Sequence, residues 1–258
     1  MIPSPIRKAL STIRRHRVAH LLMGGQACVL YGAAEFSRDL DLALLPDPAN
    51  LDRLTAALAD LDAKVIAVPS LTLKHLEEGH AVHFRCRRPD VAGLRIDIMT
   101  QMRGVAEFSE LWERRTTFAF EDETLEVMAL PDLVSAKKTQ RDKDWPMIRR
   151  LVDVNYLSHR GEPTPERLRF WLRELRSPEL LVEAAANHPD IAEELAEERP
   201  LLRLATAGNL AGGVLERALR DEEEAVRRVD AAYWKPLREQ LARLRRRPKR
   251  NPPKTFSG

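Results

Sequence analysis

The sequence has few cysteines and no long apolar run. Cys28 and Cys86 are its only cysteines, which argues against a disulfide framework or a zinc site, and we expect both thiols to be buried. No stretch approaches the roughly 18 consecutive apolar residues of a membrane-spanning helix. The N-terminal stretch carries scattered charges and lacks the apolar centre of a secretory signal. We therefore expect a cytoplasmic protein with no membrane partner.

Aromatic residues are also scarce, at 5% of the 258 residues, which is too few to predict a platform on which nucleic-acid bases stack. The proportions of hydrophobic residues, 44%, and charged residues, 31%, exclude collagen-like, low-complexity and wholly disordered chains. The net charge of +3 is too small to indicate a polyanionic partner. Residues 243–254, however, hold seven basic side chains and no acid. We expect a solvated, disordered tail there, with contact to nucleic acid as the alternative.

The hydrophobic pattern divides the chain into two unequal parts. Residues 1–130 alternate between strand-like and helix-like segments, residues 131–247 show only helical periodicity, and residues 248–258 form the end of the basic tail. This predicts an α+β fold, in which an α/β core with a mixed sheet and flanking helices precedes an all-α C-terminal bundle. Period-two alternation marks three strands, at 38–45, 80–87 and 93–100. The short, turn-rich connection between the last two predicts antiparallel neighbours.

Helix signals occur in both parts. Leucines at helical spacing from Leu51 predict a helix in the first part. In the second part Pro131 starts a helix that Trp145-Pro146 interrupts, because the residue before proline avoids the helical region. Thr164-Pro165 and Ser177-Pro178 are further starts. Three more helices are predicted, at 190–207, 213–230 and 233–247.

The informative chemistry lies in residues 21–45. An apolar stretch runs into Gly24-Gly25, a short helix is expected from Gln26, and the following strand carries Asp39 and Asp41. Paired glycines let the backbone turn and approach a ligand, and the free N–H groups at the start of a helix favour a phosphate. Two acids two residues apart on a strand leave the same face with Cα atoms roughly 6.5 to 7 Å apart. That arrangement suits one divalent ion or a pair of ions.

A third acid repeats the arrangement. Asp97 alternates with Ile96 and Ile98 on the last predicted strand, so a neighbouring strand would bring it beside the first pair. Three carboxylates so close would repel one another without cations, and hard oxygen ligands select Mg²⁺ or Mn²⁺ rather than zinc.

The combined pattern of Gly24-Gly25, thirteen intervening residues, Asp39-Leu40-Asp41 and the later Asp97 resembles the DNA polymerase β-type nucleotidyltransferase superfamily. The resemblance implies the mixed nucleotidyltransferase sheet, with Asp39, Asp41 and Asp97 as catalytic and metal-binding residues. It implies transfer of a nucleoside monophosphate from an NTP, such as ATP, to an acceptor, with release of pyrophosphate. The alternative is that the acids are ordinary solvated residues and the glycines only make a turn.

A second match is similar to the helix that follows the core of AbiEii-like bacterial nucleotidyltransferases, where a lysine precedes an Arg-x-Lys-Asp pattern. Here these positions are Lys137, Arg141, Lys143 and Asp144. On one helix, Lys137, Arg141 and Asp144 would share a face and could neutralise triphosphate oxygens, while Lys143 falls on another flank. The alternative is a solvated Arg141–Asp144 salt bridge.

The chain departs from its relatives before the acids. They often carry Arg-x-Thr where this sequence has Glu35-Phe36-Ser37. Ser37 can replace the threonine, whereas Glu35 cannot replace the arginine, so the departure bears on nucleotide affinity or substrate and not on metal binding. The resemblance assigns nucleotide binding to Gly24, Gly25, Ser37, Arg38, Lys137, Arg141, Lys143 and Asp144.

The resemblance and the basic tail favour an RNA acceptor such as tRNA, or a protein side chain, because related bacterial families include toxins of toxin–antitoxin pairs. A cognate antitoxin is then an expected partner. The alternatives are a small-molecule acceptor, as in antibiotic-modifying enzymes, and a catalytically silent binding module or antitoxin. His80 and His83 could flank the substrate cleft, although strand packing or a surface position is the simpler interpretation.

Overall fold

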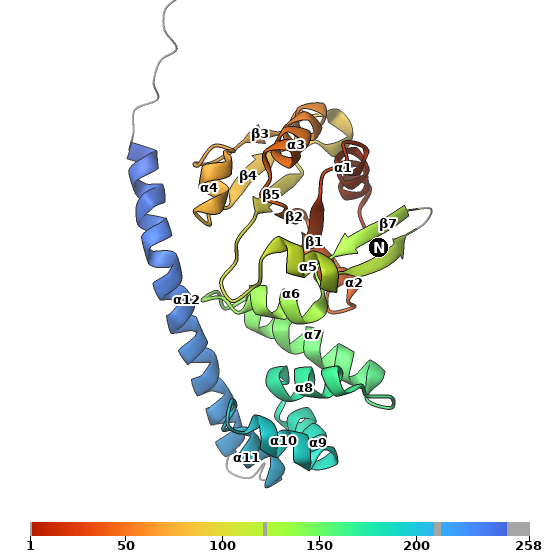
Figure 1. The fold of residues 1–258 in the computed structure, drawn as a ribbon, viewed down its shortest axis with the longest axis vertical. Helices are drawn as coiled ribbons and strands as arrows, with labels where there is room; N and C mark the ends of the chain where they lie inside the picture. Colours follow the sequence, from red (N-terminus) through yellow and green to blue (C-terminus); the bar gives the residue numbers. More distant parts are fainter. Residues whose placement is uncertain (1, 121–122, 209–212, 247–258) are drawn as a thin grey trace, which may run out of the picture.

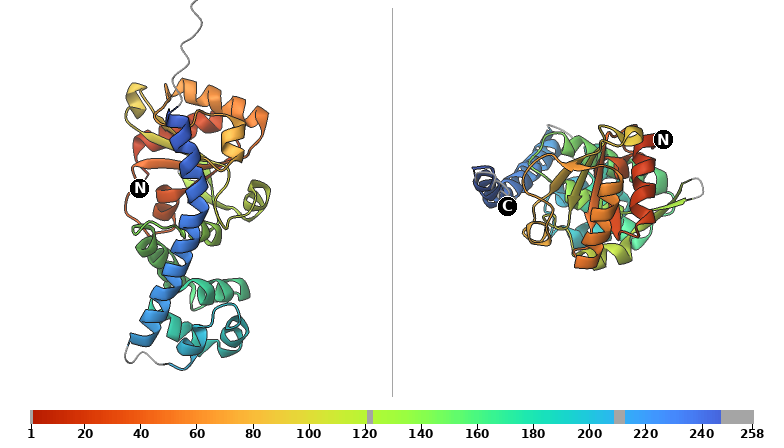
Figure 2. Two further views of the ribbon diagram at one scale, coloured as in Figure 1. Left: turned by 90° about the vertical axis from the view of Figure 1, so that its left-hand side faces the viewer. Right: turned by 90° about the horizontal axis from the view of Figure 1, so that it is seen from above.

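The computed structural model describes residues 2–120, 123–208 and 213–246. The sheet and its helices lie at one end, helices α8 to α11 lie at the other, and α12 runs beside both (Figures 1 and 2). The strands are β1 (His20–Met23), β2 (Asp39–Leu44), β3 (Lys64–Val65), β4 (Val82–Arg85), β5 (Arg95–Met99), β6 (Thr116–Phe120) and β7 (Glu123–Val127). Their order in one sheet is β3-β4-β5-β2-β1-β7-β6.

The sheet is mixed, as the sequence predicts. Strand β2 is parallel to β5, β1 is parallel to β7, and the other neighbours are antiparallel. The three strands expected at 38–45, 80–87 and 93–100 are β2, β4 and β5, and the last two are antiparallel neighbours. The α+β class, with flanking helices and a helical C-terminal region, is therefore confirmed.

The helices of the first part follow local sequence signals. Asp47 caps α3, because its carboxylate accepts a hydrogen bond from the Asn50 amide at 2.8 Å. The apolar face of α1 buries Ile6, Leu10 and Ile13. The first-part helices are α1 (Ser4–Arg15), α2 (Gly24–Leu30), α3 (Pro48–Asp60), α4 (Leu73–Glu77), the 3₁₀ turn η1 (Pro89–Val91) and α5 (Phe108–Arg114).

The helices of the second part are α6 (Leu130–Lys137), α7 (Asp144–His159), α8 (Pro165–Glu174), α9 (Pro178–Asn187), α10 (Pro189–Leu195), α11 (Leu202–Thr206) and α12 (Val214–Arg246). The starts predicted at Thr164-Pro165 and Ser177-Pro178 are confirmed as α8 and α9. Trp171, on the apolar face of α8, is fully buried. The domain boundaries predicted from composition remain predictions, and the residues of the tail from 247 onward lie outside the described part.

Three predictions of helix boundaries are wrong. The helix expected to run from Pro131 to Trp145 is two helices, and Pro146 lies in the first turn of α7, where its missing N–H leaves no bond unmade. The helix expected at 190–207 is divided into α10 and α11 around Pro200. The two helices expected at 213–230 and 233–247 are one helix, which continues through Pro236.

Contacts on either side of Pro236 hold α12 as one helix. The buried Asp230 accepts hydrogen bonds from Arg103 Nε at 3.1 Å and from the Gln140 amide at 2.8 Å. Further along, His80 Nε2 lies 2.8 Å from Gln240 Oε1. These contacts join α12 to the sheet part, so the last helix of the chain completes a surface that begins in the first half.

Within the described ranges, no helix is long and apolar enough to cross a membrane.

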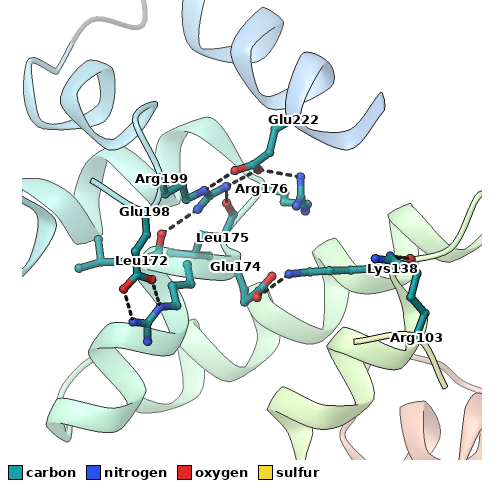
Figure 3. Close-up of polar contacts among 10 residues, drawn as sticks. Arg103, Lys138, Leu172, Glu174, Leu175, Arg176, Glu198, Arg199 and Glu222 are labelled. Carbon is teal, nitrogen blue, oxygen red and sulfur yellow. Dashed lines mark hydrogen bonds and ion pairs between the residues drawn. The ribbon is translucent and has the colours of Figure 1, made fainter. Parts of the chain in front are cut away.

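A buried ionic cluster fixes the helices of the second part against α12 (Figure 3). Arg199 contacts both carboxylate oxygens of Glu222, at 2.9 and 3.0 Å, and donates to the carbonyls of Leu172 and Leu175. The Arg199 side chain is 5% exposed. A buried arginine needs such a complete set of acceptors, because each unpaired polar group left in the interior costs free energy.

Replacing Arg199 by methionine should lower the free energy of unfolding by about 3 kcal/mol, because Glu222 loses a buried partner and two carbonyls lose a donor. Urea denaturation measures the loss. Arg173→Met is the matched control, because Arg173 also contacts a glutamate in two places but is 41% exposed. It should have a much smaller effect. Equal losses would contradict the importance of burial here.

Candidate active site

Pairing between β2 and β5 brings the predicted acids together. In the parallel register Asp41 lies opposite Asp97 and Asp39 lies opposite Arg95. Leu40 and the other alternate residues of both strands are buried, while the three acids are only partly buried. The acids therefore leave the same face of two adjacent strands, as the alternation predicts. Their catalytic role remains a prediction.

A cleft of about 400 Å³ lies between this face of the sheet and α12. Asp41 and Asp97 line it from the sheet, the loop between α6 and α7 contributes one wall, and α12 forms another. Its charged and histidine side chains are Asp41, His80, His83, Arg95, Asp97, Arg103, Lys138, Arg141, Asp230 and Arg238. Cations thus surround the carboxylates of Asp41 and Asp97, which is the charge distribution of a pocket for a metal-bound or phosphate-bearing ligand.

The Asp41 carboxylate is mostly buried and, among the described residues, has few partners that stabilise its negative charge. Burial raises its pKa, the charge of Asp97 raises it further, and the Gly25 amide and Lys137 act in the opposite direction. The Gly25 N–H donates to Asp41 Oδ2 at 3.3 Å. A carboxylate whose pKa is raised by burial and by a facing acid would be stabilised by an added cation.

The partners of Asp97 shift its pKa in the opposite direction from that of Asp41. Burial raises the pKa of its carboxyl, but hydrogen bonds from His83 and Arg95 outweigh burial and hold the pKa below its usual range. His83 Nδ1 lies 2.9 Å from Asp97 Oδ1, and Arg95 Nε donates to the same oxygen at 2.8 Å. The sequence prediction gave Arg95 no role, although it lies two residues before Asp97 on the same face of β5. The antiparallel pairing of β4 with β5 brings His83 opposite Asp97.

The two glycines let neighbouring side chains approach the backbone. Gly24 has φ +65°, and a Cβ atom there would lie 2.0 Å from Asp41 Oδ2. A Cβ atom at Gly25 would lie 2.4 Å from Ser37 Oγ. Helix α2 begins at Gly24, two residues before the predicted Gln26. The glycines are therefore needed for close contact with Asp41 and Ser37. Their predicted role in binding phosphate remains a prediction.

The second predicted set converges without sharing a helix, which corrects the expectation for residues 137–144. Helix α6 ends at Lys137, Arg141 lies in the loop, and Asp144 begins α7. Asp144 Oδ2 accepts from Arg141 Nε at 2.7 Å and from Thr139 Oγ1 at 2.5 Å, and Lys137 Nζ lies 3.9 Å from Asp144 Oδ1. The Asp144 carboxylate is 5% exposed, so the pair is not a solvated surface salt bridge.

Two other predicted nucleotide-binding residues lie outside these clusters. Arg38 is exposed, and its guanidinium carbon lies 5.4 Å from the centroid of the Phe36 ring. Lys143 is exposed and precedes α7, and its side chain makes no hydrogen bond or ion pair with any residue in the described ranges. Ser37 lies beside Gly25, and its hydroxyl donates to the Asp39 carbonyl at 3.4 Å.

The acid set fits a divalent cation by its chemistry. Asp39, Asp41 and Asp97 offer the hard oxygen ligands that Mg²⁺ and Mn²⁺ prefer, and burial and the charge of Asp97 raise the pKa of Asp41. In the described part of the chain no three His, Cys, Asp or Glu side chains already form a group that could hold a metal ion.

Comparison with models of known protein families and with curated proteins finds no match. Among solved structures, the chain is similar to the crystal structure of a "putative nucleotidyltransferase from H. pylori". The two share 17% identity and a TM-score of 0.37, over 85% of this chain and 95% of the other. This similarity is too remote to assign the chain to a family or to an activity.

Gly24→Ala should destabilise the protein more than Gly93→Ala. Both positions have positive φ, which costs an alanine about 1 to 2 kcal/mol, but nothing lies within 4 Å of a Cβ atom at Gly93. The displacement of Asp41 should add about 1 to 3 kcal/mol at Gly24. Urea denaturation of the two variants measures the difference, and equal losses would show that the contact with Asp41 does not matter.

Asp41→Asn should be more stable than the wild type at pH 7 in the presence of EDTA. Because the pKa of Asp41 is raised on folding, its ionised form costs stability. The cost is absent below the ordinary pKa of 3.8 and grows as the pH rises through the folded-state pKa. The gain should therefore vanish near pH 3, as measured by denaturation across pH.

Asp60→Asn is the control of opposite sign. Hydrogen bonding from His16 lowers the pKa of Asp60, so its ionised form stabilises the fold above the ordinary pKa, and the neutral variant should lose stability at pH 7. If the change in stability caused by Asp41→Asn follows the same pH dependence as the change caused by Asp60→Asn, the pKa of Asp41 is not raised on folding.

Proposed function

We propose that the protein is a metal-dependent nucleotidyltransferase that transfers a nucleoside monophosphate from an NTP to an acceptor. The observation that supports this most is the placement of Asp41 opposite Asp97 on adjacent parallel strands, at a cleft with cationic walls. Phosphoryl transfer depends mainly on positioning and on charge stabilisation, and this cleft offers side chains for both.

Five side chains in or beside the cleft have proposed parts. Asp39 and Asp41 would hold Mg²⁺ or Mn²⁺, and Asp97 would join them when its carboxylate is released by Arg95. The bound ion would supply charge neutralisation at the triphosphate and at the acceptor oxygen. Arg141, 58% exposed at the cleft, would contact phosphate oxygens, and Asp144 would keep its guanidinium in place.

The positive charge of α12 at the cleft supports the proposal of a polyanionic acceptor such as RNA. Its last turns, residues 235–246, carry five cations and one acid: Lys235, Arg238, Arg243, Arg245, Arg246 and Glu239. Arg238 lines the cleft, so this positive charge adjoins the candidate site. A protein side chain and a small molecule are the alternative acceptors, and the role as a toxin with a cognate antitoxin is part of the same proposal.

Incubation of the protein with labelled NTPs, Mg²⁺ and total RNA should transfer label to RNA. Asp39→Ala/Asp41→Ala should abolish the transfer, because the proposed ion then loses two of its ligands. Arg85→Gln is the matched control: it removes an exposed charge from β4, outside the residues that line the cleft, and should leave transfer unchanged. Label transfer should also weaken steeply with added salt if RNA is the acceptor.

Transfer that survives the double substitution would overturn the proposed mechanism. If no NTP is transferred and none binds in a metal-dependent way, the protein is a binding module instead. The hydrogen bonds from Arg95 and His83 to Asp97 are the observation that favours this second candidate, because they neutralise one proposed ligand without any metal.

A further inference from the structure

A second cavity, of about 700 Å³, lies between α7, α9 and α12. It shares no lining residue with the cleft beside Asp41. We name it the arginine groove, because arginine is its commonest lining residue: Arg149, Arg150, Arg176, Arg220 and Arg227. Side chains that are far apart in sequence thus direct positive charge into one hollow.

Three of these arginines have no partner in the described part of the chain. Arg149 and Arg150 on α7 and Arg220 on α12 are exposed, and none of their side chains makes a hydrogen bond or an ion pair with a described residue. The charge of Arg149 acts on Asp153 only at a distance. Guanidinium groups on two facing helices are therefore available to a ligand that enters the groove.

The other two arginines form the inner wall. Arg176 and Arg227 lie over the Trp145 ring, with guanidinium carbons 4.7 and 5.7 Å from its centroid. The buried Arg176 also lies 3.1 Å from Glu222 (Figure 3). Its Nε atom has no hydrogen-bond partner. Burial in this position lowers the pKa of Arg176, so its positive charge is poorly compensated.

Carboxylates in the groove neutralise only part of this charge. Four acids line it, and Arg227 binds two of them, Asp142 and Glu223. Glu179 and Glu216 remain, and neither is paired with Arg149, Arg150 or Arg220 by a hydrogen bond or an ion pair in the described ranges. The rim of the groove thus keeps more positive than negative side chains without a partner.

We propose that the arginine groove binds phosphate oxyanions, at a site separate from the candidate active site. Guanidinium groups offer paired donors that match the oxygens of a phosphate, and donors on both α7 and α12 favour a ligand with several oxygens over a single carboxylate. Such a ligand is either a free polyphosphate or the backbone of a nucleic acid. The proposal does not depend on catalysis at Asp41.

The test measures binding in EDTA, so that the carboxylate site holds no metal. Pyrophosphate binding is followed by calorimetry, and binding of a labelled single-stranded RNA of mixed sequence is followed by fluorescence anisotropy. Arg149→Gln/Arg220→Gln removes one exposed cation from each side of the groove. Arg85→Gln/Arg87→Gln removes two exposed cations from β4 and the turn that follows it. Thermal unfolding checks that both variants remain folded.

The groove variant should bind at least one probe about tenfold or more weakly than the wild type, and the control should not. Loss for pyrophosphate identifies a free polyphosphate as the ligand, and loss for RNA alone identifies a nucleic-acid backbone. The proposal is wrong if the wild type binds neither probe, or if the control loses as much affinity as the groove variant. Failure of nucleotide transfer would leave these outcomes unchanged.

Discussion

The candidate site depends on one strand pairing. Because β2 and β5 are parallel and in register, Asp41 faces Asp97 across neighbouring backbones, and two carboxylates at that spacing repel each other. The surrounding structure compensates for this repulsion with the Gly25 amide beside Asp41 and with Arg95 and His83 on Asp97. The close approach of backbone to carboxylate in turn requires glycine at position 24, where any Cβ atom would meet Asp41.

The second requirement of the cleft is met from the far end of the chain. Asp230 of α12 binds both Arg103 and the amide of Gln140, so one buried carboxylate joins the helix to the loop that follows β5 and to the loop that carries Arg141. Arg103 also donates to the carbonyl of Lys138, whose ammonium group contacts Glu174 (Figure 3). Through these bonds the position of the loop depends on both the sheet and the C-terminal helices.

Local periodicity predicted much of this structure, because it is set by which residues are buried. The alternation of Leu40 with its acidic neighbours identified β2 and the direction of Asp41. The grouping of Lys137 with Asp144 was also expected, but from a continuous helix that does not exist; a loop brings the residues together instead. Arg95 was not identified, although it lies only two residues from Asp97 on the same strand. Asp230 was not identified because its partners, Arg103 and Gln140, are distant in sequence. Those contacts also keep α12 continuous through Pro236, against its local preference.

The state of Asp97 distinguishes an enzyme from a binding module in physical terms. Arg95 lies opposite Asp39 in the register yet donates to Asp97, so its single charge is placed among three carboxylates and cannot neutralise them all. Asp41, whose pKa is raised by burial and by the charge of Asp97, has no arginine partner of this kind among the described residues. A divalent cation between Asp39 and Asp41 would neutralise both carboxylates, and would weaken the hold of Arg95 on Asp97 by repelling the guanidinium. Metal binding at Asp39 and Asp41 would therefore loosen the Arg95–Asp97 ion pair, which otherwise opposes metal binding at Asp97.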